Sequence, residues 1–255
     1  MAAGLKFRRS DGAVIAYERE GARDERNPGI VFLHGLKSDR GGTKAEALAR
    51  HAGVRGYGFL RFDMFGHGAS SGRFEDGGIS RWVEDAVAVL DELTTGPQVL
   101  IGSSMGGWVM VKTAMARPER VSGLVGIAVA PDFTEDLMWA GFDASQRDAL
   151  AMAGVVELPS EYEDGPYRIS RHLIEDGRKN LVLRNEIPIA CPVRLIHGQQ
   201  DTAVPWETSL KLAARIKGGN VETHLVKDGD HRLSRPQDLE RLCGFVDELV
   251  MKGRL

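Results

Sequence analysis

Cysteine is scarce in this chain. Only Cys191 and Cys243 are present among 255 residues, and they are far apart and lack the spacing of metal ligands. A disulfide framework and a cysteine-based zinc site are therefore excluded as ways of holding the fold together. Because a thiol is inert without an activating base, both cysteines are expected to be packing residues. We expect no metal and no cofactor.

Long apolar runs and blocks of one charge are also missing. No window approaches the roughly 18 apolar residues of a membrane span, and the first residues lack the apolar stretch of a secretory signal. The formal net charge is -3 and lysine and arginine are spread along the chain, so a nucleic-acid partner is not expected. These absences favour a cytoplasmic protein without a membrane span, and they leave the oligomeric state open.

What the chain does contain is a series of short apolar runs separated by amphipathic segments. The runs are too continuous for half-exposed strands and are typical of buried parallel strands. They cover residues 30–33, 58–62, 99–101, 124–129 and 193–196. Apolar residues with helical spacing lie between them, for example over residues 83–90. Ahead of the first run, a turn signal at residues 10–12 and alternation over residues 13–17 predict an antiparallel hairpin.

This alternation predicts one α/β domain over residues 1–255. Its sheet should be mostly parallel and twisted, with helices on both faces and the N-terminal antiparallel hairpin at one edge. A chain of 255 residues is long enough to bury a substantial core in a single domain. Residues 131–188 form a longer excursion with helical pieces. We predict a short helical cap there, with a purely structural excursion as the alternative.

A serine with glycines on either side follows the apolar run 99–101 directly. Ser104 lies between Gly102 and Gly106, in the pattern of a nucleophile elbow, where a strand turns sharply into a helix. Such a turn strains the serine and leaves no room for side chains at the two glycine positions. We therefore predict that Ser104 attacks an ester or thioester carbonyl. The alternative is a glycine-rich turn in which Ser104 caps the helix.

A serine hydroxyl needs a base to take its proton and a carboxylate to orient that base. In the chain order that accompanies a nucleophile elbow, the acid comes next and the histidine last. Asp201 follows the apolar run 193–196, and His231 follows an alternating strand at residues 221–226. Asp132, beyond the run 124–129, is the rival for the acid.

Acyl transfer also needs N–H donors for the oxyanion. The Met105 N–H follows the nucleophile, and the Leu36 N–H follows Gly35 in the loop after the first buried run. For substrate contacts we consider His34. Like His67 and His197, it precedes a glycine at a loop after a strand, where a ring that shapes the loop by hydrogen bonding is the alternative. Arg171 and Arg178 in the cap are further candidates for binding a substrate carboxylate, with solvated surface charge as the alternative.

Taken together, these landmarks resemble the α/β-hydrolase family. They match the family in order, from Ile30 to Val250. The landmarks are residues 32–35, residues 61–70, the turn at Ser104, residues 197–201 and the pair Asp230-His231. The resemblance implies the α/β-hydrolase fold, with nucleophile, acid and base at Ser104, Asp201 and His231.

Several stretches are similar to one branch of that family, the mitochondrial palmitoyl-protein thioesterases that also act as acyl-glucuronide esterases. These stretches are residues 41–45, 96–108, 116–121, 204–206 and 230–232. The resemblance implies cleavage of a small-molecule ester or thioester, of an S-acylated protein, or of a glucuronic-acid ester. The chain departs from the branch by having His34-Gly35 where Pro-Gly is expected, and by lacking an evident mitochondrial presequence. We therefore expect a bacterial relative.

Other kinds of protein are compatible with the same motifs. A non-catalytic binding protein can share the scaffold, although it would usually lose one member of the triad. A peptide or carbon–carbon bond hydrolase can use the same triad, because a fold does not decide a function. Dehalogenase and epoxide hydrolase chemistry is disfavoured, since it requires a carboxylate where Ser104 stands.

Overall fold

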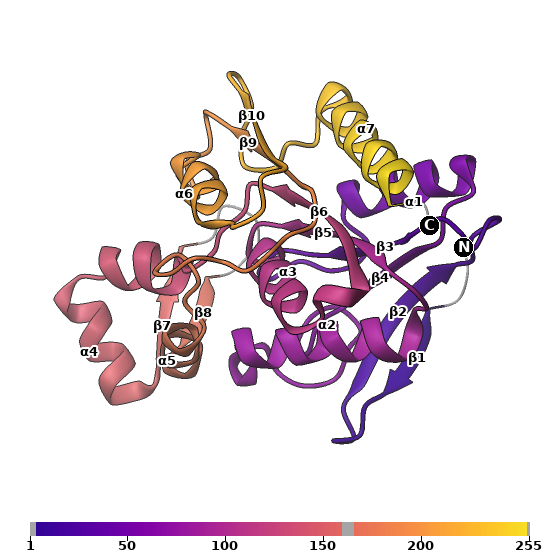
Figure 1. Ribbon diagram of the computed structural model, residues 1–255. Coiled ribbons are helices and arrows are strands. Elements are labelled where there is room, and N and C mark those ends of the chain that lie inside the picture. Colours follow the sequence, from indigo (N-terminus) through magenta and orange to yellow (C-terminus); the bar gives the residue numbers. More distant parts are fainter. Residues whose placement is uncertain (1–3, 160–165, 254–255) are drawn as a thin grey trace.

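The computed structural model describes residues 4–159 and 166–253. Within these ranges an eight-stranded sheet has the order β1-β2-β4-β3-β5-β6-β9-β10. Its strands are β1 (Leu5–Arg8), β2 (Val14–Glu20), β3 (Gly29–Leu33), β4 (Phe59–Phe62), β5 (Gln98–Ser103), β6 (Val121–Ile127), β9 (Val193–Gly198) and β10 (Val221–Val226). Figure 1 shows the sheet as the twisted centre of the molecule.

Most neighbouring strands of this sheet are parallel. The pairs from β4 through β3, β5, β6 and β9 to β10 all run in parallel. β1 pairs antiparallel with β2, and β2 pairs antiparallel with β4. Every residue of β5 is buried, as expected for a parallel strand covered on both faces. The predicted mostly parallel sheet with an N-terminal antiparallel hairpin is therefore confirmed.

Helices cover both faces of the sheet. They are α1 (Thr43–Arg55), α2 (Ile79–Leu93), α3 (Met105–Ala116), α6 (Glu207–Arg215) and α7 (Pro236–Lys252). Along β5, Val99 packs in the same apolar cluster as α1 and α7, whereas Leu100 packs in the cluster of α2, α3 and α6. Successive side chains of a strand point to opposite faces, so the two clusters flank the sheet. Figure 1 shows α1 and α7 on one side and α2 and α3 on the other.

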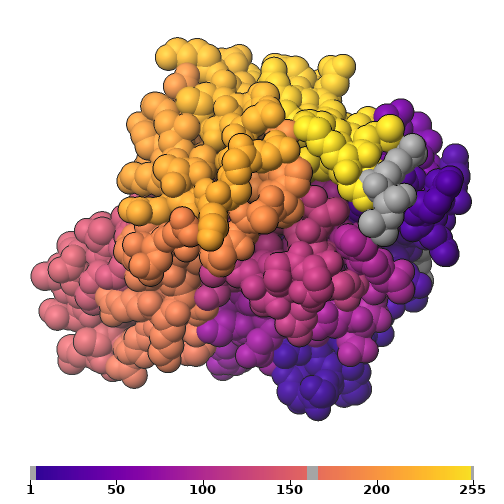
Figure 2. Space-filling model, viewed as in Figure 1, coloured from indigo at the N-terminus to yellow at the C-terminus, as the bar shows by residue number. Residues whose placement is uncertain are grey.

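The segment between β6 and β9 forms the cap. It contains a π-helix (Thr134–Trp139), α4 (Ala144–Ala153), β7 (Val155–Leu158), β8 (Tyr167–Ser170) and α5 (Arg171–Lys179). β7 and β8 pair antiparallel in a small separate sheet, which the prediction of a short helical cap did not include. Figure 2 shows this part of the chain as a lobe beside the main body. Residues 160–165 of the predicted cap lie outside the described residues.

Two short 3₁₀ helices are also present, η1 (Phe74–Asp76) and η2 (Pro118–Arg120). Within the described ranges, none of the helices has the length and apolar character needed to cross a membrane.

The loops that leave the parallel strands at their carboxyl ends lie next to the cap, because residues from both line one cavity. This edge of the sheet is where ligands bind in α/β folds.

Candidate active site

Ser104 stands at the turn between β5 and α3. Its backbone has φ 54° and ψ -120°, a conformation that residues with side chains rarely adopt. A methyl group on Gly102 would lie 2.5 Å from the Gly106 carbonyl oxygen, and one on Gly106 would lie 2.3 Å from that of Leu33. Glycine is therefore required on both sides of the serine, and the turn sets Ser104 at the N-terminus of α3.

His231 joins Ser104 to Asp201. The Ser104 Oγ lies 3.1 Å from His231 Nε2, and His231 Nδ1 lies 2.6 Å from Asp201 Oδ2. Because a carboxylate only accepts hydrogen bonds, we assign the imidazole proton to Nδ1, which leaves Nε2 to accept the serine proton. The structure thus brings together three sequence-predicted residues that follow β5, β9 and β10.

Backbone and imidazole N–H groups surround the Asp201 carboxylate. Its Oδ1 accepts the N–H groups of Ala203 and Val204, each at 2.8 Å. Its Oδ2 accepts His197 Nε2–H at 3.0 Å in addition to His231. Burial by itself raises the pKa of Asp201, but the hydrogen bonds from the two histidines outweigh it and hold that pKa below its ordinary value. Asp201 therefore stays ionised beside His231.

His197 is a contributor whose contact with Asp201 the sequence did not reveal. The side chain is fully buried at the end of β9, and its Nδ1 lies 2.7 Å from the Ser209 hydroxyl. When Ser209 donates to Nδ1, the imidazole proton is on Nε2 and available to Asp201. The histidine before glycine predicted a loop-shaping ring, and its place four residues before Asp201 was the only further signal.

Asp132, the rival for the acid, has other partners. Its carboxylate accepts the N–H groups of Val182 and Leu183, at 2.8 and 2.9 Å. The Arg184 guanidinium lies 3.4 Å away. These contacts fasten the end of the cap to the loop after β6. The structure therefore brings Asp201 to His231, and it gives Asp132 an anchoring position.

The backbone at Leu36 and Met105 forms the wall next to Ser104. Met105 is the first residue of α3, where N–H groups have no partner within the helix. A methyl group on Gly35 would lie 3.4 Å from the Ser104 Cβ, so the loop after β3 passes directly beside the serine. Leu36 and Met105 line the same cavity as Ser104. Both positions predicted for oxyanion donors thus flank the serine.

His34 lines this cavity, but both nitrogens of its ring form hydrogen bonds with the backbone. Its Nε2 accepts the Met64 N–H at 3.1 Å, and its Nδ1–H donates to the Gly35 carbonyl at 2.8 Å. Burial lowers the pKa of His34 to about 4, so the ring is neutral near pH 7. Of the two roles expected for His34, the geometry favours loop shaping over contact with substrate.

Arg171 and Arg178, the other predicted substrate contacts, do not line the cavity. Arg178 donates to Glu135 at 2.7 Å and lies over the Trp139 ring, 4.5 Å from its centroid. Arg171 faces Glu175 at 3.7 Å. Seven residues apart in α5, the two arginines share the exposed face of that helix. Their presence in the cap was visible in the sequence, but the face on which they lie was not.

The cavity beside Ser104 has a volume of about 590 Å³. Its wall from the cap is formed by Phe133, Leu137, Met138 and Tyr167. Cationic residues also line it, and these are Lys37, Lys44 and Arg232; the acidic residue Asp39 lines it as well. An apolar group and an anionic group can therefore be accommodated in one cavity.

Lys44 links two segments of the cavity wall. Its Nζ donates to the Arg232 carbonyl oxygen at 2.7 Å, which links the start of α1 to the residue after His231. Burial lowers the pKa of Lys44 to about 8, an effect that Asp230 opposes and Arg232 reinforces. The sequence did not reveal this lysine, because α1 and the loop after β10 meet only in the folded chain.

The two cysteines do not pair with each other and do not belong to the wall of this cavity. Each is a free thiol, and burial raises the pKa of Cys191 to about 11 and that of Cys243 above its ordinary value. Neither lines the cavity beside Ser104. Among the residues that the structure describes, no three or more His, Cys, Asp or Glu side chains are grouped to hold a metal ion.

Comparison with known proteins shows the family to which the chain belongs. Residues 24–156 match the family model described as serine aminopeptidase, S33 (Hydrolase_4). The chain belongs to this α/β-hydrolase family. A bovine protein named "Palmitoyl-protein thioesterase ABHD10, mitochondrial" is 38% identical to it over 245 residues, which are 96% of this chain and 79% of the relative.

Solved α/β-hydrolase structures agree with this assignment. A putative hydrolase from Agrobacterium vitis S4 is 40% identical, with a TM-score of 0.92 over 97% of this chain and 98% of that one. The α/β hydrolase domain-containing protein 10 from mouse is 37% identical, with a TM-score of 0.90 over 98% and 99% of the two chains. The predicted fold and the resemblance to the palmitoyl-protein thioesterase branch are confirmed.

Proposed function

We propose that this α/β-hydrolase is a serine esterase or thioesterase that works through an acyl-enzyme on Ser104. The observation that carries the proposal is the pair of hydrogen bonds from Ser104 to His231 and from His231 to Asp201. The bovine relative's name, which describes a thioesterase, supports cleavage of an acyl bond.

In the first half of the reaction, His231 Nε2 takes the Ser104 proton while Oγ attacks the acyl carbonyl carbon. The electron pair of the carbonyl moves to oxygen, where the N–H groups of Leu36 and Met105 stabilise the negative charge. The intermediate then expels the alcohol or thiol, which receives the proton from His231. Asp201 holds the imidazole and stabilises its charged form.

In the second half, water replaces the alcohol or thiol. His231 takes a proton from the water as its oxygen attacks the acyl-serine carbonyl, and the same two N–H groups stabilise the oxyanion again. Collapse breaks the bond to Ser104 Oγ, returns the proton to it and releases the acid. Both halves therefore depend on one fixed geometry around Ser104.

Thioesters with an apolar acyl chain are the first candidate substrates. The cap wall of Phe133, Leu137, Met138 and Tyr167 supplies apolar surface next to Ser104. Small-molecule thioesters and S-acylated proteins both carry such a chain. The bovine relative's name, a palmitoyl-protein thioesterase, points to the same substrate class.

Acyl glucuronides are a second candidate, favoured by the cations of the cavity. Their alcohol half carries a carboxylate, which Lys37, Lys44 or Arg232 can bind. These residues replace Arg171 and Arg178 as the candidate carboxylate contacts. Parallel kinetics on a long-chain thioester, on the matching oxyester and on an acyl glucuronide will rank the substrates.

Labelling with a fluorophosphonate and turnover of a p-nitrophenyl ester test the reaction class. The native chain should react with the probe at Ser104, and Ser104→Ala should not be labelled. The kcat of Ser104→Ala should be at least about 10⁴-fold lower than that of the native chain. Full turnover by Ser104→Ala would refute the acyl-enzyme. A chain that takes no label would be a binding protein. A labelled chain that cleaves an aminoacyl amide or a carbon–carbon bond faster than any ester would be a different kind of hydrolase.

A further inference from the structure

Two histidines join the loop after β3 to the loop after β4 in a reciprocal arrangement. His34, in the first loop, accepts the Met64 N–H of the second at 3.1 Å. His67, in the second loop, accepts the Lys37 N–H of the first at 3.2 Å. The centroids of the two rings are 4.9 Å apart. Each loop therefore holds the backbone of the other.

The tautomer of His67 follows from its partners. The Lys37 N–H can only donate, so Nε2 must present a lone pair. Nδ1 lies 3.1 Å from the Phe65 carbonyl oxygen, which can only accept, so Nδ1 carries the proton. A neutral imidazole protonated at Nδ1 satisfies both backbone groups.

Lys37 is the residue that this hydrogen bond restrains. Its φ is 56°, a left-handed conformation that is unfavourable for a residue with a side chain. The Ser38 N–H closes the turn on the Gly35 carbonyl at 3.2 Å. Leu36 is therefore held between Gly35, which passes beside Ser104, and Lys37, which is bonded to His67.

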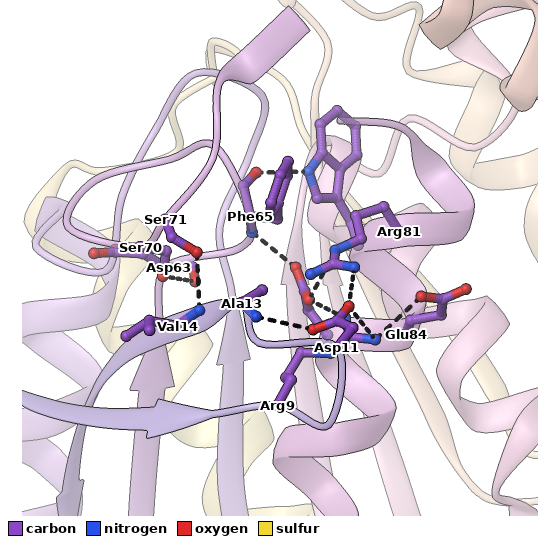
Figure 3. A network of polar contacts seen from close by, with 12 residues as sticks. Arg9, Asp11, Ala13, Val14, Asp63, Phe65, Ser70, Ser71, Arg81 and Glu84 are labelled. Carbon is purple, nitrogen blue, oxygen red and sulfur yellow. Dashed lines mark hydrogen bonds and ion pairs between the residues drawn. The ribbon is translucent and has the colours of Figure 1, made fainter. Parts of the chain in front are cut away.

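His67 is in turn held firmly by α2 and its surroundings. The Phe65 carbonyl that accepts the hydrogen bond from His67 Nδ1–H also accepts the Trp82 indole N–H at 3.0 Å, and the Phe65 N–H donates to Asp85 at 2.7 Å. Figure 3 shows Phe65 fixed by contacts on both its N–H and its carbonyl side. The rings of Phe74 and Trp82 pack edge-on against His67, with centroids 5.4 and 5.3 Å away.

We propose that His67 is a positioning residue of the oxyanion hole. The proposal rests on the proposed function, in which the Leu36 N–H stabilises the oxyanion. His67 is buried and does not line the cavity, so it acts through Lys37, whose N–H it accepts, and fixes the direction of the neighbouring Leu36 N–H. A hydrogen-bond donor that already has the correct direction before the reaction begins stabilises the transition state without any reorganisation of the protein.

The ring keeps its lone pair throughout the neutral pH range. Burial, with smaller contributions from His34 and Lys37, lowers the pKa of His67 to about 3, and the Phe65 carbonyl and Asp63 only partly oppose this shift. Protonation of His67 therefore does not compete with the hydrogen bond from Lys37 at the pH at which His231 acts as a base.

Two substitutions separate positioning from folding. His67→Phe keeps a ring against Phe74 and Trp82 but offers no acceptor, whereas His67→Gln retains both an acceptor and a donor. We expect His67→Phe to lower kcat about 10- to 100-fold. The affinity for a trifluoromethyl ketone inhibitor, which forms an oxyanion when Ser104 attacks it, should fall by a similar factor. Substrate affinity, measured in the Ser104→Ala background, should stay within about twofold. His67→Gln should recover most of the loss in kcat.

His51→Gln is the matched control. His51 Nε2 lies 2.9 Å from Asp247 on α7, away from the cavity, so this variant should keep the native kcat. The inference is overturned if folded His67→Phe keeps its kcat, if substrate affinity falls as far as kcat, or if His67→Gln is no better than His67→Phe. Because Ser104→Ala tests the proposed function separately, a chain that needs Ser104 but tolerates His67→Phe refutes only this inference.

A measurement on the native chain covers the case in which His67→Phe does not fold. The ¹⁵N spectrum of the imidazoles at pH 7 should show His67 protonated at Nδ1 alone. A ring protonated at Nε2 could not accept the Lys37 N–H, and that result would overturn the inference.

Discussion

The loops at the carboxyl edge of the sheet and the cap beside them are restrained in different ways. At the sheet edge, Ser104 and Lys37 hold positive φ angles, and buried glycines and histidines hold the backbone around them. In the cap beyond the buried anchor Asp132, the residues facing the cavity are apolar, and charged side chains such as Arg178 pair on the outside. The edge therefore requires fixed positions of individual atoms, while the cap requires apolar volume of a suitable shape.

The largest expected effect contrasts two aspartates at these regions. Asp201→Asn cannot hold His231 in the required tautomer and should lower kcat by about 10⁴-fold. Asp132→Asn should keep kcat within about threefold but lower the free energy of unfolding by about 1–3 kcal/mol, because one buried N–H loses its acceptor. Kinetics and urea unfolding of both variants measure the contrast. Equal losses of kcat would show that the cap anchor belongs to the catalytic geometry.

A smaller effect contrasts two glycines. A methyl group on Gly106 would lie within 2.4 Å of the carbonyl oxygens of Leu33 and His34, whereas one on Gly141 in the cap meets nothing within 4 Å. Gly106→Ala should push the Ser104 turn out of place and lower kcat by about 100-fold, with a lower melting temperature. Gly141→Ala should leave both quantities near the native values. Native kcat in Gly106→Ala would contradict the tight packing of the sheet edge.

The smallest effect tests the cationic part of the cavity through pH. The pKa of Lys44 is about 8, below its ordinary value, so its charge is present below that pH and is lost as the pH rises through it. The preference in kcat/KM for an acyl glucuronide over its neutral methyl ester should therefore fall about two- to fivefold between pH 7 and pH 9. Lys44→Met, which has no charge to lose, should show at every pH the low preference that the native chain reaches at pH 9. A preference that is unchanged by pH and by the substitution would remove Lys44 as a carboxylate contact.

The strands and the elbow were predictable because their signals are local. The continuous apolar run 193–196 predicted a buried parallel strand, and β9 contains it. The glycines around Ser104 are required by contacts within the turn and its neighbouring strands, so their spacing marks the turn in the sequence. By contrast, β7 and β8 are four residues each and were missed, since so small a sheet depends on packing for its stability.

The histidines show what local sequence signals do not predict, namely the partner to which each ring is hydrogen-bonded. His34, His67 and His197 each precede a glycine after a strand, and the sequence predicts a loop-shaping ring for all three. In the folded chain His197 bonds to Asp201, while His34 and His67 join two different loops. The loop that each ring reaches depends on the order of strands in the sheet, and the spacing of residues along the sequence does not reveal that order.

The sequence alone determined the alternation of strands and helices, the strained serine turn, and the chain order of Ser104, Asp201 and His231, the residues that we propose as nucleophile, acid and base. These features depend on residue type and on short-range spacing, which every stretch of sequence carries by itself. The tertiary structure alone decided that Asp201 meets His231 while Asp132 anchors the cap, and that Lys44 lines the cavity while Arg171 and Arg178 face outward. Such contacts join residues far apart in the chain, and only the packing of the complete sheet and its helices sets the distances between them.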